Sequence, residues 1–250
     1  MRLKVEVPFK MRTVVISQPT YLPWTGYFRI MKEADIYVFA DNVQFESGSW
    51  QCRNRIKTPT KWKWLTVPVM HSSLFCPIKD IQISNNQSWT QKHWNTLNSC
   101  YGKTPYFGTH SAFFKSLYEQ KWSSLLELNI KIITYLASQL GLSPIFLRSS
   151  QLKTEGKRTH LALSICKLLA ADRYVSSMGA WEYMKKEHAD ELFKNEGIKL
   201  EFLKYSTPTY PQLFGDFVPD LSFVDCLFNC GPDSSKIMLQ ENSAAFQSLH

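Results

Sequence analysis

The chain has 250 residues, of which 44% are apolar and 20% charged, a composition typical of a globular protein with one large α/β domain or two small ones. No run of about 18 apolar residues occurs, which excludes a membrane-spanning helix, and the first residues lack the apolar segment of a signal peptide, so we expect a cytoplasmic protein. The net charge of +8 favours an anionic partner, although nucleic acid is not expected because no nucleic-acid-binding module is recognisable.

The six cysteines predict free thiols in a reducing compartment, because none forms a Cys-x-x-Cys pair and a chain of this length needs no disulfide staples. Cys226 and Cys230 share one face of a predicted helix, a spacing that some metal sites use. No histidine lies near them in the sequence, so we expect both to pack in the core and expect no metal site.

The first fifty residues predict a β-α-β unit. Residues 13–18 are β-branched and apolar, the pattern of a buried strand, and Pro19 and Pro23 prevent its continuation. Residues 24–34 have apolar side chains at helical spacing, and residues 35–41 are again typical of a strand. A strand, a helix and a strand within about 30 residues form the crossover unit of a parallel sheet.

The rest of the chain continues the alternation of strands and helices, with a helical middle. The pattern predicts strands at 63–69, 78–84, 173–179 and 198–205, helices at 87–101, 111–140, 158–170, 180–195 and 221–231, and helix ends at Gly102, Gly141 and Gly231. We therefore expect one α/β domain over residues 11–232, with a mostly parallel, Rossmann-like sheet, flanking helices and a helical insertion at about 86–170. Residues 1–10 are expected to form an arm, and residues 233–250 a tail.

Polar residues follow three predicted strands directly. In open α/β sheets the ligand binds at the carboxyl ends of the strands, where Gln18, Asp41 and the pair Ser176 and Ser177 are expected to lie. Each of these side chains could instead brace its own turn, which is a common role for glutamine and aspartate. Together they favour a ligand pocket.

Residues 49–64 combine five positive residues with no acidic one. Arg53 and Arg55 alternate, so on an extended strand they face the same side. The arginine fork suits phosphate or carboxylate, and interleaved tryptophans such as Trp50 suit stacking on a base or a sugar. The competing interpretation is a solvated strand face.

His93 is the strongest candidate for acid–base chemistry, since Trp89 and Trp94 flank it on a predicted helix. A lone histidine on a helix is more commonly structural, so both roles stay open. Backbone N–H groups near Gly179 could bind an oxyanion, because a small-residue turn there leads into the next helix. Covalent catalysis by Cys226 or Cys230 is not expected, because apolar neighbours raise a thiol pKa.

These motifs, in this order, resemble the WbqC-like protein family. The segments QPTYLPWTGYF, ADIYVFADNVQF, SWQCRNRIKT, TPYF, SSMGAWEY and LSFVDCLFNCG carry the resemblance between residues 11 and 231. An acidic pair of the family is reduced here to Asp41 followed by Asn42, so a mechanism that needed both carboxylates would lack one.

The resemblance implies a function in surface-polysaccharide biosynthesis, because the family's genes are associated with O-antigen and related clusters. We expect transfer of an acyl or aminoacyl group to the amine of a nucleotide-linked or lipid-linked amino sugar. The expected donor is acyl-coenzyme A or an acidic acyl carrier protein, which suits the positive chain, and no tightly bound cofactor is expected. His93 or Asp41 would act as the base, and the N–H groups near Gly179 would stabilise the tetrahedral oxyanion.

Two other functions stay open. An ATP-dependent adenylating or nucleotidyl-transfer enzyme is one, although the His-x-x-His pair of such enzymes is absent from the turn at residues 24–27. A non-catalytic accessory protein that binds sugar or nucleic acid is the other. No feature of the sequence sets the oligomeric state. The substrate-binding residues that these arguments predict are Gln18, Tyr21, Trp24, Gln44, Trp50, Arg53, Asn54, Arg55, Lys57, Ser177 and Gly179.

Overall fold

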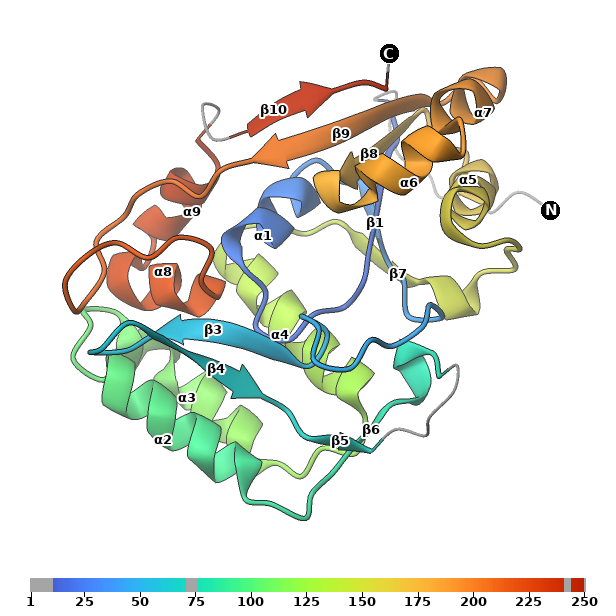
Figure 1. The fold of residues 1–250 in the computed structure, drawn as a ribbon. Helices are drawn as coiled ribbons and strands as arrows, with labels where there is room; N and C mark the ends of the chain where they lie inside the picture. The colour runs from blue at the N-terminus through green and yellow to red at the C-terminus, as the bar shows by residue number, and fades with distance from the viewer. Residues whose placement is uncertain (1–10, 71–75, 241–243, 250) are drawn as a thin grey trace.

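The computed structural model describes residues 11–70, 76–240 and 244–249, and a six-stranded sheet forms its centre (Figure 1). The strand order is β10-β9-β8-β1-β2-β7, and every neighbouring pair is parallel except β10 with β9. The strands span Thr13–Ser17 (β1), Ile36–Phe39 (β2), Ile145–Arg148 (β7), Arg173–Ser177 (β8), Lys199–Tyr205 (β9) and Ala244–Gln247 (β10). The expected α/β fold with a mostly parallel sheet is therefore confirmed.

The predicted β-α-β unit lies at the middle of the sheet. Strands β1 and β2 pair in parallel with Val14 opposite Ile36, and α1 (Thr25–Met31) connects them. The chain then adds β7 beyond β2 and crosses back to place β8 and β9 on the other side of β1. The strand order thus reverses between β1 and β8. In an open parallel sheet this switch point leaves a crevice at the carboxyl ends of the two strands.

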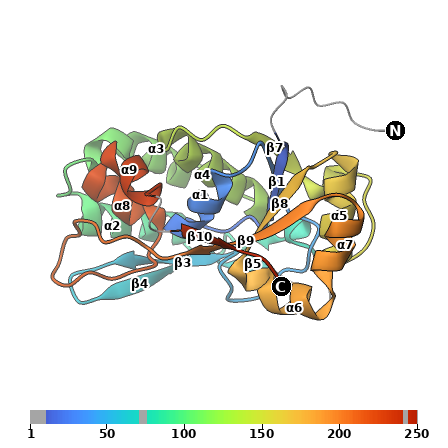
Figure 2. The same cartoon turned by 90° about the horizontal axis from the view of Figure 1, so that it is seen from above.

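Alternate residues of the central strands point to opposite faces of the sheet, as a pleated strand requires. Val15 and Tyr37 belong to a buried cluster with α1 and α4, whereas Val14 and Ile36 belong to a second cluster with α5, α6 and α7. These helices span Leu125–Gln139 (α4), Arg158–Leu168 (α5), Trp181–Lys186 (α6) and Ala189–Asn195 (α7). Figure 2 shows the resulting layers, with the sheet between the two groups of helices.

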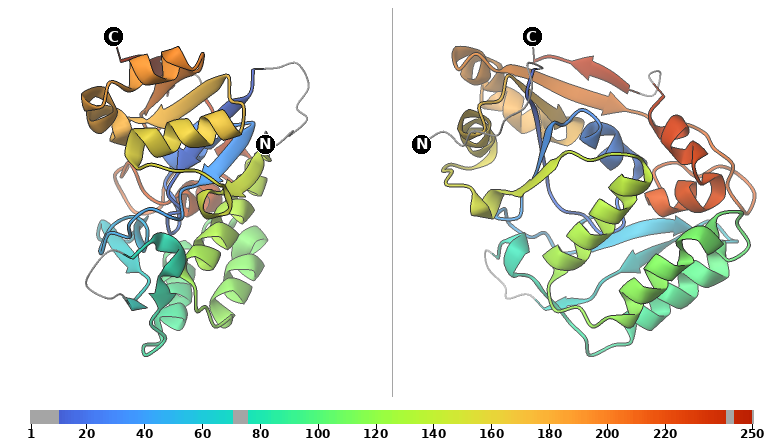
Figure 3. Two further views of the ribbon diagram at one scale, coloured as in Figure 1. Left: turned by 90° about the vertical axis from the view of Figure 1, so that its right-hand side faces the viewer. Right: turned by 180° about the vertical axis from the view of Figure 1, so that it is seen from behind.

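The helical middle segment begins with α2 (Trp89–Tyr101) and α3 (Phe107–Glu119), which lie at the end of the molecule opposite β9 and β10 (Figure 3). The single helix predicted at 111–140 is two helices, because the Ser124 side chain accepts a hydrogen bond from the Glu127 N–H and starts α4 anew. Strand β7 follows α4 directly. The stretch predicted as a helical insertion thus also supplies a strand to the main sheet.

Two predicted strands do not join the main sheet. The strand expected at 63–69 corresponds mainly to β4 (Trp62–Thr66), which pairs in a hairpin with β3 (Arg53–Lys57). The strand expected at 78–84 corresponds to β6 (Gln82–Ile83), which pairs with β5 (Val69–Met70). Short turns of 3-10 helix occur at Ile78–Asp80 (η1), Ser149–Gln151 (η2) and Met178–Ala180 (η3). The β3–β4 hairpin lies beside α2 and α3, below the main sheet in Figure 1.

The C-terminal part is more ordered than the sequence pattern predicts. The helix predicted at 180–195 divides into α6 and α7 at His188, whose φ of +50° interrupts the helical backbone. Helix α8 (Phe223–Cys230) is followed by α9 (Asp233–Met238), and β10 pairs antiparallel with β9. Helix α8 lies in the helix predicted at 221–231, whereas α9 and β10 occupy the region expected to be a tail. In the part of the chain that the structure describes, no helix combines the length and apolar character that crossing a membrane requires.

Candidate functional site

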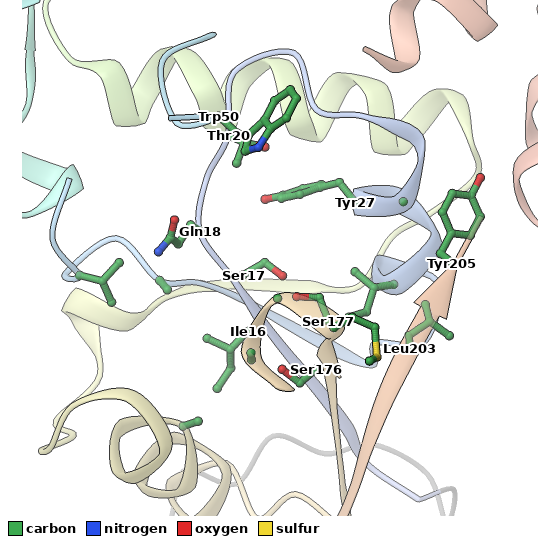
Figure 4. Close-up of a pocket in the computed structure, with 18 of the residues that line it drawn as sticks. Ile16, Ser17, Gln18, Thr20, Tyr27, Trp50, Ser176, Ser177, Leu203 and Tyr205 are labelled. Carbon is green, nitrogen blue, oxygen red and sulfur yellow. The ribbon is translucent and has the colours of Figure 1, made fainter. Parts of the chain in front are cut away.

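A pocket of about 810 Å³ lies at the switch point of the sheet. Ser17 at the end of β1 and Ser176 and Ser177 at the end of β8 form its floor, while Tyr27 of α1 and Trp50 lie across from them (Figure 4). Helix α5 also contributes to the lining, because its first residues lie at the same edge of the sheet. The volume lies in the range of pockets that hold nucleotide-sized ligands.

The charges that line this pocket are all positive. Arg158 at the start of α5 and Lys204 of β9 are its charged residues, and no aspartate, glutamate or histidine is present among the described lining residues. The remaining polar groups are hydroxyls, one amide and the indole N–H groups of Trp24 and Trp50, and aromatic rings cover much of the wall. Such a lining suits an anionic ligand with a planar or sugar group, but it offers no carboxylate or imidazole for proton transfer.

Trp24 and Gly26 build the wall at the entrance to α1. The Trp24 ring packs edge-on against Tyr205, with 5.7 Å between ring centroids, and both side chains line the pocket. A Cβ atom at Gly26 would lie 2.3 Å from the Trp24 ring, so only glycine lets the indole take this position. The Trp24-Thr25-Gly26 segment therefore shapes the wall of the pocket and does more than end a strand.

The turn before α1 is held from outside the pocket. Leu22 has a φ of +44°, an unusual conformation for a branched residue. The Asn54 amide donates to the carbonyls of Leu22 and Tyr21 at 2.7 Å and 3.3 Å, and Asn129 donates to the Pro19 carbonyl at 3.2 Å. Asn54 and Tyr21 therefore do not line the pocket, and both stabilise the loop that does.

Gln18 lies where the sequence predicts, at the end of β1 and in the pocket lining. Its side-chain carbonyl accepts a hydrogen bond of 2.8 Å from the Gln51 amide, which fixes the amide group of Gln18 toward the cavity edge. Gln51 is itself buried and accepts a bond from the Glu46 N–H. Gln44, in contrast, is exposed and does not line the pocket.

Asp41 is fully buried and holds β2 to the turn after β7. Its carboxyl oxygens lie 2.9 Å from the Ser149 hydroxyl, 2.8 Å from the Ser150 N–H and 2.6 Å from the Ser150 hydroxyl. Asn42 accepts a further bond from Ser149 at 2.6 Å. Ala40 lines the pocket but Asp41 does not, so its carboxyl group faces the protein interior.

Arg53 and Arg55 lie on one face of the β3–β4 hairpin with three tryptophans. The Arg53 guanidinium lies 4.3 Å from the centre of the Trp64 ring, and that of Arg55 lies 5.3 Å from Trp62. Trp50 is 5.2 Å from Trp64 between ring centroids. Of this group only Trp50 lines the switch-point pocket, so the arginines lie beside it rather than in it.

Lys57 shares the hairpin face with the two arginines, but its end of the face is covered. Its ammonium donates to the Gln212 side-chain carbonyl at 3.0 Å and to the Asp216 backbone carbonyl, and the residue is almost fully buried. Gln212 and Asp216 belong to the loop at 206–221. Lys57 therefore anchors that loop and does not line the pocket.

His93 is buried between α2 and the hairpin and lies outside the pocket lining. Its Nδ1 atom lies 2.8 Å from the Tyr21 hydroxyl, which in turn lies 2.5 Å from that of Tyr118. Burial lowers the pKa of His93 from 6.5 to about 4. The imidazole is thus a neutral member of a buried hydrogen-bond network.

Because His93 is buried in its neutral form, we predict that the free energy of unfolding decreases on acidification. The unfolded chain takes up a proton below pH 6.5, whereas the folded protein resists it down to about pH 4. Stability is therefore complete above pH 6.5 and falls as the pH drops toward 4, by about 2 kcal/mol between roughly pH 7 and pH 5. Urea unfolding of wild type and His93→Gln at both pH values would measure this difference.

The measurement must be a difference between variants, because Asp225 acts in the opposite direction. Burial raises the pKa of Asp225 from 3.8 to about 6, so its cost to stability is present above pH 6 and disappears as the pH falls toward 4. The exposed His160 provides the control, and His160→Gln should keep the wild-type profile. An identical pH dependence in wild type and His93→Gln would contradict the buried, neutral imidazole.

Several pocket residues have no signal in the sequence pattern. They are Thr20, Tyr27, Arg158, Lys204 and Tyr205. Arg158 could not be found from the pattern, because its place depends on β7, which the pattern does not predict. Ser176, which the pattern does place beside Ser177 at the end of a strand, also lines the pocket.

Two further predicted residues line the pocket, and the cysteines do not. Ser177 and Gly179 line it directly after β8. All six cysteines are free, and the hydrogen bond with Cys230, together with burial, raises the pKa of the Cys226 thiol. Within residues 11–70, 76–240 and 244–249, no group of three or more His, Cys, Asp or Glu side chains comes together as a metal site would require.

Comparisons with known proteins place the chain in one family. The WbqC-like protein family matches residues 18–237, which contain most of the pocket lining, the hairpin and the helical segment. An uncharacterized protein of Mycobacterium tuberculosis is 30% identical over 226 residues, which cover 90% of this chain and 96% of the relative. No solved structure gives a significant match. This chain belongs to the WbqC-like protein family.

Proposed function

We propose that this protein transfers an acyl or aminoacyl group to the amine of a nucleotide-linked or lipid-linked amino sugar in surface-polysaccharide biosynthesis. The observation that carries the proposal is the switch-point pocket, which has positive charges, hydroxyls and aromatic rings but no carboxylate among its described residues. A sugar bound through a diphosphate has the complementary chemistry. Its phosphates need positive charge, its hydroxyls need polar partners, and its base or sugar ring can stack on an aromatic side chain.

The start of α5 is the best place for the diphosphate. Arg158 lines the pocket there and is one of the two charged residues of its described lining. The Thr159 N–H already donates to the Glu187 carboxylate at 3.3 Å, so we assign the phosphate contact to the Arg158 guanidinium rather than to the backbone of the helix start. Ser176, Ser177 and the backbone near Gly179 lie across the pocket and could contact the sugar.

The proposed reaction requires little from the protein besides alignment. The sugar amine attacks the thioester carbonyl of the donor, a C–N bond forms, the C–S bond breaks, and the amine proton leaves with the thiol. Asp41 and His93 lie outside the pocket, so we assign proton transfer to neither. We assign stabilisation of the tetrahedral oxyanion to the N–H groups of the turn at Ser177 and Gly179.

Adenylyl or nucleotidyl transfer is a second candidate, favoured by the same lack of a proton-accepting side chain. Such reactions depend mainly on positioning and on charge that neutralises the phosphates, which this pocket supplies. The strand order with a switch point at β1 and β8 also suits a nucleotide. The fold alone does not decide between the two reactions, so the identity of the bound ligand has to decide between them.

A thermal-shift screen separates the candidates, since a ligand that binds only the folded state raises the melting temperature. The ligands would be UDP-, GDP- and dTDP-sugars with and without an amine, acyl-coenzyme A, and ATP with magnesium. We expect a rise of about 5–10 °C with an amino-sugar nucleotide at roughly 100-fold excess over its Kd. A response to ATP alone would favour adenylyl transfer, and a response to no nucleotide would contradict both reactions.

Two variants of α5 then test whether the hit occupies the pocket. Arg158 lines it and forms a surface ion pair of 3.6 Å with Glu187, whereas Lys167 forms a surface ion pair with Glu196 away from it. Arg158→Gln should weaken binding roughly tenfold or more, because a charged hydrogen bond to phosphate is lost. Lys167→Gln removes the same charge from the same helix and should leave the affinity unchanged.

A further inference from the structure

The outer face of the β3–β4 hairpin is a second candidate binding surface beside the pocket. We call it the arginine–tryptophan face and define it as Trp50, Arg53, Arg55, Trp62 and Trp64. Its geometry follows from strand register, since Arg55 pairs with Trp64 across the hairpin and the alternate residues on each strand share that side. The Arg55 guanidinium lies within 6.0 Å of all three indole rings.

The two guanidinium groups are nearly free of protein partners. In the described part of the chain the Arg53 side chain makes no hydrogen bond or ion pair, and its Nε atom is buried without an acceptor. Arg55 makes one hydrogen bond, of 3.1 Å, to the Asp220 backbone carbonyl, and its Nε atom also lacks an acceptor. Two adjacent cations that no carboxylate neutralises destabilise each other, and a bound anion would remove this cost in free energy.

The tryptophans add a stacking surface to this positive charge. The Trp50 side chain is 45% exposed, although a large aromatic residue is normally covered. A planar ring on Trp50 would bury this surface, and the neighbouring guanidinium groups would reach phosphates attached to it. Aromatic rings interleaved with arginines are the arrangement by which proteins hold nucleotides without reading their sequence.

The face and the pocket are continuous. Trp50 lines the switch-point pocket and also contacts Trp64 and Arg55, so a ligand on the face would reach toward the ligand in the pocket. Group transfer needs two substrates side by side. The pocket accounts for one of them, and the arginine–tryptophan face is suited to the other.

We propose that the arginine–tryptophan face binds the purine nucleotide portion of the second substrate, with the base on Trp50 and the phosphates on Arg53 and Arg55. This inference rests on the proposed group transfer and adds the chemical class of the donor. Coenzyme A and ATP share this chemistry, a purine nucleotide with several phosphates. An acyl carrier protein, whose donor group carries no nucleotide, does not.

Calorimetric titration of the full chain tests this assignment with matched ligands. Acetyl-coenzyme A carries the nucleotide, S-acetylpantetheine lacks it, and ATP carries it without the acyl arm. We expect acetyl-coenzyme A or ATP to bind at least tenfold more tightly than S-acetylpantetheine. If ATP binds and acetyl-coenzyme A does not, the face still binds a purine nucleotide, but the donor is ATP.

Variants on the two faces of the hairpin assign the binding to specific side chains. Arg53→Ala should weaken the nucleotide at least tenfold, and Arg53→Lys should recover only part of the loss because the planar fork is missing. Lys63→Ala is the control, since Lys63 is exposed on β4, pairs with Ile56 and lies on the opposite face. Equal affinities in Arg53→Ala and Lys63→Ala would overturn the assignment.

Two further outcomes separate this inference from the proposed function. If an amino-sugar nucleotide binds in an Arg158-dependent way while Arg53→Ala changes nothing, the assignment of the face fails and the proposed function stands. If a purine nucleotide binds through Arg53 but no sugar nucleotide binds, the proposed function fails. Preferential binding of single-stranded oligonucleotide with a steep salt dependence would overturn the donor assignment.

Discussion

Asp41→Ala is expected to lower the free energy of unfolding by about 4 kcal/mol, because a fully buried carboxyl group loses its contacts with Ser149 and Ser150 and leaves both Ser150 donors, the N–H and the hydroxyl, unpaired. The stability of a domain is typically about 5–15 kcal/mol, so the variant would retain a small margin. Ser149 and Ser150 directly follow β7 and Asp41 follows β2, so the contact holds two neighbouring strand ends together. Guanidinium unfolding at neutral pH would measure the loss.

Asn42→Ala is the matched control for this effect. Asn42 accepts a single bond from the same Ser149 hydroxyl, so its removal should lower the free energy of unfolding by about 1 kcal/mol. Asp41→Asn should be intermediate, since it retains one acceptor oxygen. A stable Asp41→Ala protein that has lost its reaction would contradict this structural role and make Asp41 a catalytic residue.

Gly231→Ala is expected to lower the free energy of unfolding by about 4 kcal/mol, from backbone strain and steric overlap together. Gly231 ends α8 with φ +51° and ψ −126°, and a Cβ atom there would lie 2.4 Å from the Tyr106 ring. The ring cannot easily withdraw, because the Tyr106 N–H donates to the Phe228 carbonyl at 3.1 Å. Thermal and denaturant unfolding would both report the change.

Gly141→Ala separates the two contributions. Gly141 follows α4 with φ +70°, but no atom lies within 4 Å of a Cβ built at that position. The substitution should therefore cost about 1 kcal/mol, from backbone strain alone. If both substitutions cost the same, the Tyr106 contact would contribute nothing, and the argument for Gly231 would be wrong.

The sequence predicts those parts of the fold that depend on local pattern. Residues 13–18 and 35–41 are apolar and β-branched over a whole strand, so β1 and β2 were found with their connecting helix. Strand β7 is as short as β2 but lies at the edge of the sheet, and its residues are exposed or half-buried, so its sequence, IFLR, shows neither a buried run nor an alternation. Strand β10 was missed because its sequence, AAFQ, has neither β-branched residues nor a buried alternation.

The candidate site was found only in part, because the strand order decides which residues meet. Gln18 and Ser177 lie together because β1 and β8 are neighbours at the switch point. Asp41 also follows a strand, but its side chain points away from the pocket. The sequence pattern correctly places His93 on a helix. It does not show that this side of the helix packs against Tyr21 in the interior.

The lining of the pocket is collected from distant parts of the chain. Gln18, Trp50, Arg158, Ser177 and Lys204 meet across almost two hundred residues of sequence. Closing such long loops costs entropy that is recovered only when the last segment docks, so the cavity should appear late in folding. Neither half of the chain on its own would contain a binding site. Dissection into fragments would therefore remove the pocket, whereas a point substitution at its rim would change only one part of the lining.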